Sequence, residues 1–166
     1  MSKILISGYY GFANAGDEAM LTAIIESLRQ VEKNVELTVL SGNPEDTAAK
    51  HQVCSVYRFN PLGIIQAMKD SELIISGGGS LLQDVTSKRS LLYYLSIIGL
   101  GKFFGKKVML FAQGIGPIRA KWARKLTSLV CNEADLITVR DSESAAELIE
   151  MGVKPEKITV TADSKG

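Results

Sequence analysis

Arg140 is the side chain whose chemistry is most directly indicated by its place in the sequence. It follows residues 137–139, an apolar stretch typical of a buried strand, so we expect its guanidinium at a strand end. Guanidinium donates paired hydrogen bonds to phosphate and carboxylate oxygens, a geometry that Lys does not reproduce. Arg140 is therefore a candidate anion ligand. The alternative is an ion pair with Asp141 or Asp17.

Asp17 lies in a glycine-rich turn between a short apolar run and a helical pattern. Gly8, Gly11 and Gly16 permit positive φ and close approach of the backbone to a ligand. Asn14 and Asp17 can accept hydrogen bonds from the free N–H groups that begin the helix, so an ordinary cap is one interpretation of Asp17. The glycine spacing fits neither G-x-G-x-x-G nor G-x-x-x-x-G-K-[ST], and we expect no cofactor here.

Four polar, glycine-bearing segments follow predicted strands, at residues 8–17, 77–87, 113–117 and 140–144. Because the carboxyl ends of parallel strands meet at one edge of a sheet, we expect these segments to line one crevice. Backbone N–H groups of the triple glycine could hold an anion there, although a plain flexible turn is the alternative. The predicted substrate-binding residues are Gly8, Tyr10, Asn14, Gly16, Gly77, Gly78, Gly79, Ser80, Gln83, Asp84, Ser87, Gln113, Gly114 and Gly116.

Strands and helices alternate along the sequence. Short apolar runs predict about seven strands, and segments with helical periodicity or helix-start signals separate them, such as the one that begins at Pro61. This alternation predicts an α/β fold, a Rossmann-like, doubly wound and mainly parallel sheet with helices on both faces. We expect residues 1–166 to form a single domain. The chain stops directly after a predicted strand, which we interpret as a cut rather than a natural terminus.

Composition narrows the classes of partner and compartment. A net charge of +1 gives no reason to expect nucleic acid. Cys54 and Cys131 form no C-x-x-C pair and indicate a reduced, cytoplasmic setting. The longest apolar run, at residues 91–100, is too short for a membrane helix. We expect a solvent-exposed His51 and no metal site.

Five segments in order carry a family resemblance: GYYGFANAGDEAML (8–21), GGGSLLQDVTSKRSLLYY (77–94), AQGIGP (112–117), ITVRDSES (137–144) and TAD (161–163). Together they resemble the polysaccharide pyruvyltransferase family, and most closely its CsaB-type members. That resemblance implies a two-domain GT-B architecture, in which two Rossmann-like halves face each other across a cleft. This chain would be the N-terminal half, and its partner would be the C-terminal domain of the same enzyme.

The resemblance also implies a reaction. Members of the family look like transferases that move the pyruvyl group of phosphoenolpyruvate onto two hydroxyls of a sugar, forming a ketal. In CsaB-type enzymes the acceptor is an N-acetylmannosamine of a lipid-linked secondary cell-wall polymer precursor, and such ketals serve S-layer anchoring. Arg140 matches the family's V-R-D motif. Asp17 would be either a general base or a cap. The family's histidine and lysine belong to the other half, so we expect this fragment alone to be inactive.

Three alternatives remain open from the sequence. The chain could be half of a pyruvyltransferase, half of a GT-B glycosyltransferase, or a nucleotide- or metabolite-binding module without catalysis. Peripheral contact with the inner face of the cell membrane is a further expectation with two interpretations. An apolar stripe with basic residues beside it either packs on the sheet or faces anionic lipid. The apolar residues are Ile118, Trp122, Leu126, Leu129 and Val130. The basic residues are Arg119, Lys121, Arg124 and Lys125, and Lys102, Lys106 and Lys107 add further positive charge.

Overall fold

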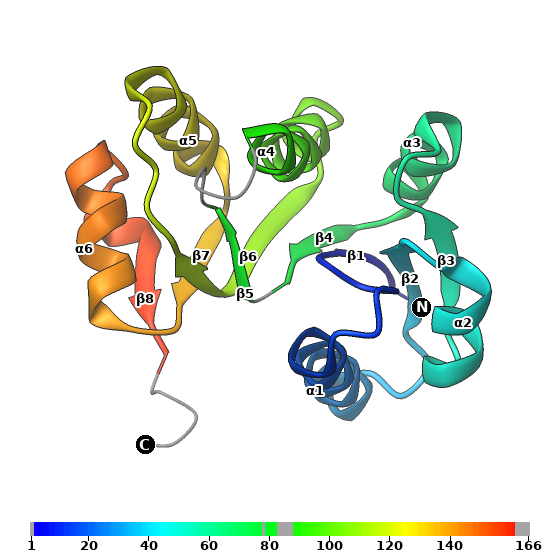
Figure 1. Cartoon of the computed structure of the whole chain (residues 1–166). Coiled ribbons are helices and arrows are strands. Elements are labelled where there is room, and N and C mark those ends of the chain that lie inside the picture. The colour runs from blue at the N-terminus through cyan, green and yellow to red at the C-terminus, as the bar shows by residue number, and fades with distance from the viewer. Residues whose placement is uncertain (1, 78, 83–87, 162–166) are drawn as a thin grey trace.

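The computed structural model describes residues 2–77, 79–82 and 88–161 (Figure 1). Its described strands are β1 (Lys3–Ser7), β2 (Glu36–Ser41), β3 (Cys54–Tyr57), β4 (Leu73–Ser76), β5 (Gly79–Leu82), β6 (Lys107–Ile115), β7 (Leu136–Val139) and β8 (Ile158–Val160). The helices are α1 (Ala15–Val31), α2 (Pro44–His51), α3 (Pro61–Asp70), α4 (Lys88–Phe103), α5 (Lys121–Glu133) and α6 (Ser142–Met151), with a 3₁₀ turn η1 (Pro155–Lys157). None of the helices among these residues is long and apolar enough to cross a bilayer.

All pairs of neighbouring strands are parallel, in the order β3-β2-β1-β4-β6-β7-β8, with β5 also paired to β6. β4 pairs with the first half of β6 and β5 with its second half, so the two short strands follow each other along one neighbour. The expected doubly wound fold is confirmed. β5 was not anticipated because a glycine-rich sequence is a poor strand former.

Strand order reverses between β1 and β4. The chain runs outward from β1 through β2 to β3, then returns to place β4 on the other side of β1 and continues to β8. In open α/β sheets, the crevice outside the carboxyl ends of the strands at such a reversal is where ligands bind. The fold therefore selects the edge between the ends of β1 and β4 as the first place to look for a site.

The sheet buries one hydrophobic cluster on each face. α1 packs on one face, opposite α3, α4 and α5 (Figure 1). Within β1 the side chains alternate, because Ile4 and Ile6 belong to the α1 cluster while Leu5 belongs to the larger cluster on the other face. Burial on both faces explains the continuous apolar run of this strand.

Side-chain caps fix where the helices begin. Asn14, Asn43 and Asn60 each accept a hydrogen bond from a backbone N–H in the first turn of α1, α2 and α3. At the carboxyl end of α6, Gly152 adopts a left-handed conformation, and the N–H of Val153 donates to the Leu148 carbonyl. Gly152 and the buried Val153 thus form a glycine C-cap with its apolar contact, a common way for a helix to end.

Candidate functional site

Tyr10 lies buried at the reversal of strand order. An added Cβ at Gly8 would overlap its ring, and one at Gly77 would overlap its hydroxyl, so both glycines leave space that the tyrosine fills. Burial, with smaller contributions from Asp17, Tyr94 and Glu18, raises the pKa of Tyr10 well above its usual range. Tyr10 therefore ties the turn after β1 to the turn after β4 as a neutral, packed side chain.

Gln113 supports the same turn from β6. Its side chain is fully buried, and Nε2 donates to the carbonyl oxygens of Ser76 (3.0 Å) and Gly77 (2.5 Å). The Gly77 N–H donates to the Ser7 carbonyl (2.6 Å), so the residue after β4 is tied to β1 as well as to β6. The structure thus gives Gln113 a supporting position, and its direct contact with a substrate stays a prediction.

Three buried polar atoms at this edge have no hydrogen-bond partner among the described residues: Ser7 Oγ, Tyr10 Oη and Gln113 Oε1. Buried polar atoms cost free energy unless water or a ligand satisfies them. Their grouping at the ends of β1 and β6 marks this edge as the place where a polar ligand would gain most.

Arg140 follows β7 on the same edge, and its backbone N–H donates to the Gln113 carbonyl (3.1 Å). Its guanidinium lies against Gly114, where an added Cβ would overlap it. The register between β6 and β7 shifts between Leu110 and Gln113, with Ala112 at φ 50°, and such a bulge re-aims the residues that follow.

The guanidinium of Arg140 has room for a ligand. Its side chain is 53% exposed, and Nε lies 3.5 Å from Asp141 Oδ2. Asp141 is already engaged as the cap of α6, where its Oδ1 accepts from the Ser144 N–H (2.8 Å). These hydrogen bonds and the neighbouring Arg140 lower the pKa of Asp141. The predicted ion pair with Asp141 is present, but it occupies only one edge of the guanidinium.

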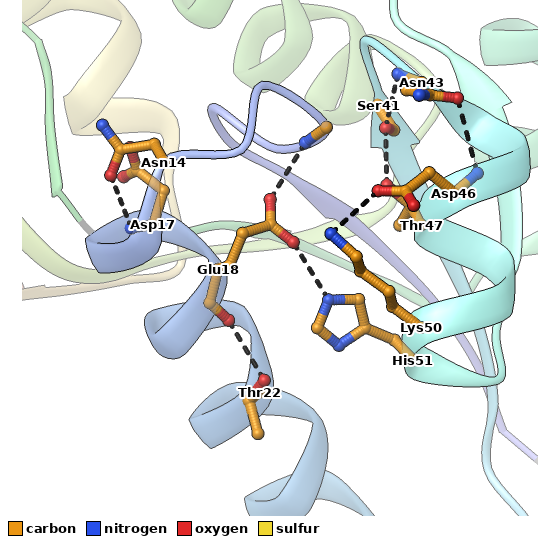
Figure 2. Close-up of polar contacts among 11 residues, drawn as sticks. Asn14, Asp17, Glu18, Thr22, Ser41, Asn43, Asp46, Thr47, Lys50 and His51 are labelled. Atoms are coloured by element: carbon orange, nitrogen blue, oxygen red, sulfur yellow. Dashed lines mark hydrogen bonds and ion pairs between the residues drawn. The ribbon is translucent and has the colours of Figure 1, made fainter.

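Asp17 is not the cap of α1. Asn14 is, because its Oδ1 accepts from the Asp17 N–H at 3.1 Å (Figure 2). The Asp17 carboxylate has no hydrogen-bond or ion-pair partner within the described part of the chain. Partial burial, and then the adjacent Glu18, raise the pKa of this carboxyl. An uncommitted carboxylate with a raised pKa is better suited to accept a proton than an ordinary one.

Glu18 is a residue of this edge that sequence reasoning missed. Its Oε2 accepts from the Gly11 N–H (3.0 Å) and its Oε1 lies 3.1 Å from His51 Nε2 (Figure 2). The expectation of an exposed His51 is wrong: its side chain is 9% exposed, because α2 packs beside α1 and brings it to Glu18. The consecutive Asp-Glu at a helix start was the available signal. Its partner, 33 residues away, was not predictable.

The remaining predicted residues fall into two groups. Gly16 lies in the first turn of α1, Gly79 and Ser80 lie in β5, and Gly116 donates its N–H to the Leu82 carbonyl beside β5. Gly78, Gln83, Asp84 and Ser87 lie outside the described residues.

Two hollows in the described surface lie away from this edge. One of about 440 Å³ is bordered by α5 and α6, and one of about 200 Å³ lies near the amino end of β1. Neither is bordered by a predicted site residue. The strand reversal, the unpartnered polar atoms and the half-exposed Arg140 favour the carboxyl edge over either hollow, since those features supply chemistry as well as space.

Comparison with solved structures shows the same fold in longer proteins. HepE of Anabaena in complex with UDP-glucose matches with a TM-score of 0.68 and 16% identity, over 96% of this chain and 43% of that one. The UDP-GlcNAc 2-epimerase of Neisseria meningitidis bound to UDP-GlcNAc matches with a TM-score of 0.59 and 12% identity, over 99% and 46%. This chain thus spans less than half the length of either protein. A search of curated proteins found no match.

The family assignment comes from a different comparison. The model of the polysaccharide pyruvyl transferase family matches residues 14–164, which include α1 with Asp17, the triple glycine, β6 and Arg140. That match covers every described strand except β1, and the edge segments discussed above from Asn14 onward. The chain belongs to the polysaccharide pyruvyl transferase family, a family of transferases.

Proposed function

We propose that this chain is the N-terminal domain of a CsaB-type pyruvyltransferase. Its reaction would transfer the pyruvyl group of phosphoenolpyruvate to an N-acetylmannosamine-type sugar of a lipid-linked secondary cell-wall polymer precursor. The observation that carries the proposal is a pair of opposite charges on one sheet edge: the half-exposed Arg140 guanidinium, which has one long contact with Asp141, and the Asp17 carboxylate, which has no partner among the described residues. An anionic donor needs a cation such as Arg140 to bind it, and an attacking hydroxyl needs a base such as Asp17 to accept its proton.

The chemistry assigns a separate task to each charge. One sugar hydroxyl oxygen bonds to C2 of the donor while the methylene carbon gains a proton. A second hydroxyl oxygen then displaces phosphate from the same carbon. Of the two hydroxyl protons, one balances the proton gained by carbon and the other leaves with phosphate. Arg140 holds the anionic groups of the donor, and Asp17 accepts a hydroxyl proton.

A second half of the enzyme completes this proposal. Proteins of the same fold are more than twice as long as this chain. Closing a cleft excludes water and holds the donor from both sides, and one wall supplies neither. We therefore expect the isolated 166-residue chain to show a cooperative thermal melt and no release of phosphate from phosphoenolpyruvate above background. A non-cooperative melt would contradict the domain assignment.

A glycosyltransferase is the second candidate, since HepE of the same fold was solved with UDP-glucose. The two candidates consume different donors. Incubation of the full-length protein with an N-acetylmannosamine glycoside and either phosphoenolpyruvate or a UDP-sugar separates them. We expect phosphate release only with phosphoenolpyruvate. Consumption of the UDP-sugar would overturn the proposal, and binding without turnover of either donor would favour a non-catalytic module.

We extend the proposal to peripheral contact with anionic lipid, because a lipid-linked acceptor requires work at a membrane. The predicted apolar stripe, which lies on α5 and the residues just before it, is split in the structure. Ile118 is buried, whereas Trp122 and Leu129 are exposed beside the exposed Lys121 and Lys125. An aromatic and a leucine flanked by lysines are the side chains that an interfacial helix presents to anionic headgroups.

A further inference from the structure

Arg58 occupies an unusual environment directly after β3. Its side chain is almost entirely buried, with the residue 8% exposed, and five aromatic rings surround its Cζ at centroid distances of 4.6 to 5.9 Å. These rings come from three segments: Tyr9 and Phe12 after β1, Phe59 after β3, and Tyr93 and Tyr94 on α4. Ring faces stabilise a cation, but they do not replace its hydrogen bonds.

The guanidinium of Arg58 lacks an acidic partner among the described residues. Its one side-chain hydrogen bond there runs from Nη2 to Tyr94 Oη at 3.4 Å, and its buried Nε has no partner. Burial raises the pKa of Tyr94 to about 12, so its hydroxyl is neutral and offers no compensating charge. A buried cation without an anion costs free energy unless another group stabilises it. Within the described part of the chain, the group that Arg58 lacks is an anion.

Three of the rings over Arg58, those of Tyr9, Phe12 and Phe59, are exposed to solvent. Tyr9 and Phe12 stack at 4.3 Å between centroids, Phe59 is 57% exposed, and Gly42 leaves room for the Phe12 ring. Exposed aromatic faces gathered in one place mark a binding surface. We call Tyr9, Phe12, Arg58, Phe59, Tyr93 and Tyr94 the aromatic cluster.

The aromatic cluster adjoins the proposed site. Tyr9 and Phe12 belong to the turn that leads into α1, where Asp17 lies, and Phe12 neighbours the Gly11 N–H held by Glu18. The Asp17 carboxylate is also near enough to Tyr94 to contribute to the rise in its pKa. A ligand over the rings would therefore lie next to the carboxylate that we assign to proton transfer.

We propose that the aromatic cluster is the subsite for a phosphorylated sugar, with the sugar ring stacked on the exposed faces of Tyr9, Phe12 and Phe59 and a phosphate oxygen accepting from Arg58. The inference rests on the proposed function in that it assigns the acceptor, rather than the donor, to this place. Sugar rings carry apolar C–H faces that pack on aromatic rings, and a phosphate supplies the anion that Arg58 lacks. An anion without a sugar ring would bind Arg58 but would not stack on the rings. A neutral sugar would stack on the rings but would leave Arg58 without an anion.

The test is calorimetric titration of the full-length protein with N-acetylmannosamine 1-phosphate, N-acetylmannosamine and inorganic phosphate. The variants are Phe12→Ala with Phe59→Ala, both on the surface, and Phe103→Ala as the control, an exposed phenylalanine at the end of α4. We expect the sugar phosphate to bind about tenfold more tightly than either part alone. The double variant should lose that advantage, and the control should keep it.

Kinetics assign the subsite to one substrate. The KM for phosphoenolpyruvate should change less than about twofold in the double variant while the KM for the acceptor rises about tenfold. Equal binding of sugar phosphate and phosphate would overturn the inference, as would a wild-type affinity in the double variant or a larger rise in the donor KM. If phosphoenolpyruvate is never consumed but the titrations behave as expected, the proposed function fails and the subsite stands.

Discussion

Two regions of this molecule hold arginine in opposite ways. On the outer helices, Arg124 of α5 contacts Glu147 at 2.7 Å and Glu150 at 3.1 Å, so its charge is fully used in joining α5 to α6. At the carboxyl edge, Arg140 has one long contact with Asp141, and Arg58 has no acidic partner in the described structure. An arginine whose charge is satisfied by the fold is structural, whereas one that the fold positions but leaves underpaired is available to a ligand.

The largest expected effect comes from replacing each arginine by lysine in the full-length protein. Arg140→Lys should lower kcat/KM for phosphoenolpyruvate by about a hundredfold, because a lysine cannot make the paired contact with an anionic donor. Arg124→Lys should leave kcat/KM within about twofold, since α5 and α6 lie away from the edge. Steady-state kinetics measure kcat/KM for each variant, and thermal melts check that each variant is folded. Comparable losses in both variants would erase the distinction between the two regions.

The packing of the edge is tested by two glycines. Gly77→Ala should destabilise the protein by about 2 kcal/mol, because its Cβ would overlap the buried Tyr10 hydroxyl. Gly99→Ala on α4 meets nothing within 4 Å and should stabilise by up to about 1 kcal/mol through helix propensity. Urea denaturation measures both. A neutral Gly77→Ala would show that Tyr10 moves freely and that the turn is not held in place.

The pH dependence of Asp17 gives a smaller effect. Burial, and then Glu18, raise its folded-state pKa above the unfolded value. Any stability that this carboxyl contributes is therefore present below its ordinary pKa and is lost as the pH rises through the folded-state pKa. Asp17→Asn should raise Tm by about 1 °C at pH 7 and not at about pH 3, and should lower kcat.

The matched control for Asp17 is Asp70→Asn, an exposed carboxylate that accepts from Gln66 on α3. It should keep full activity. In the wild type, the acid limb of kcat against pH should lie above the range of an ordinary aspartate, since the base must be ionised. An Asp17→Asn enzyme with wild-type kcat would mean that Asp17 is not the base.

The smallest expected effect concerns the membrane. Co-sedimentation at low salt should recover more full-length protein with vesicles of anionic lipid than with neutral ones, by about two- to fivefold. Lys121→Gln with Lys125→Gln should remove the difference, and Lys33→Gln with Lys50→Gln, which lie elsewhere on exposed surface, should not. Equal recovery with both kinds of vesicle would contradict lipid contact through α5.

Sequence patterns predicted the fold because burial on both faces leaves a direct signal. The apolar runs of β1 and β4, and the Gly152–Val153 helix end, depend on residues close together in the sequence. They predicted Arg140 at a strand end for the same reason. The family resemblance, carried by five segments in order, agrees with the match over residues 14–164.

The sequence could not predict contacts between distant segments. Glu18 and His51 are 33 residues apart, and Arg58 and Tyr94 are 36 apart. In the sequence alone, nothing distinguishes these residues from ordinary polar and aromatic residues. The strand order brings the members of each pair together. Gln113 illustrates the same limit, because its pattern does not distinguish a side chain that lines a crevice from one that supports a turn from below.

Pyruvyl transfer, as proposed for this enzyme, requires that the C–O bond of phosphoenolpyruvate break rather than its P–O bond. Both oxygens of a pyruvyl ketal come from the sugar, so the bridging oxygen of the donor must leave with phosphate. The most direct measurement is phosphorus NMR of the full-length enzyme with an N-acetylmannosamine glycoside and phosphoenolpyruvate labelled with ¹⁸O at the bridging position. We predict ¹⁸O in the released phosphate. Recovery of the label in pyruvate, with unlabelled phosphate, would contradict pyruvyl transfer.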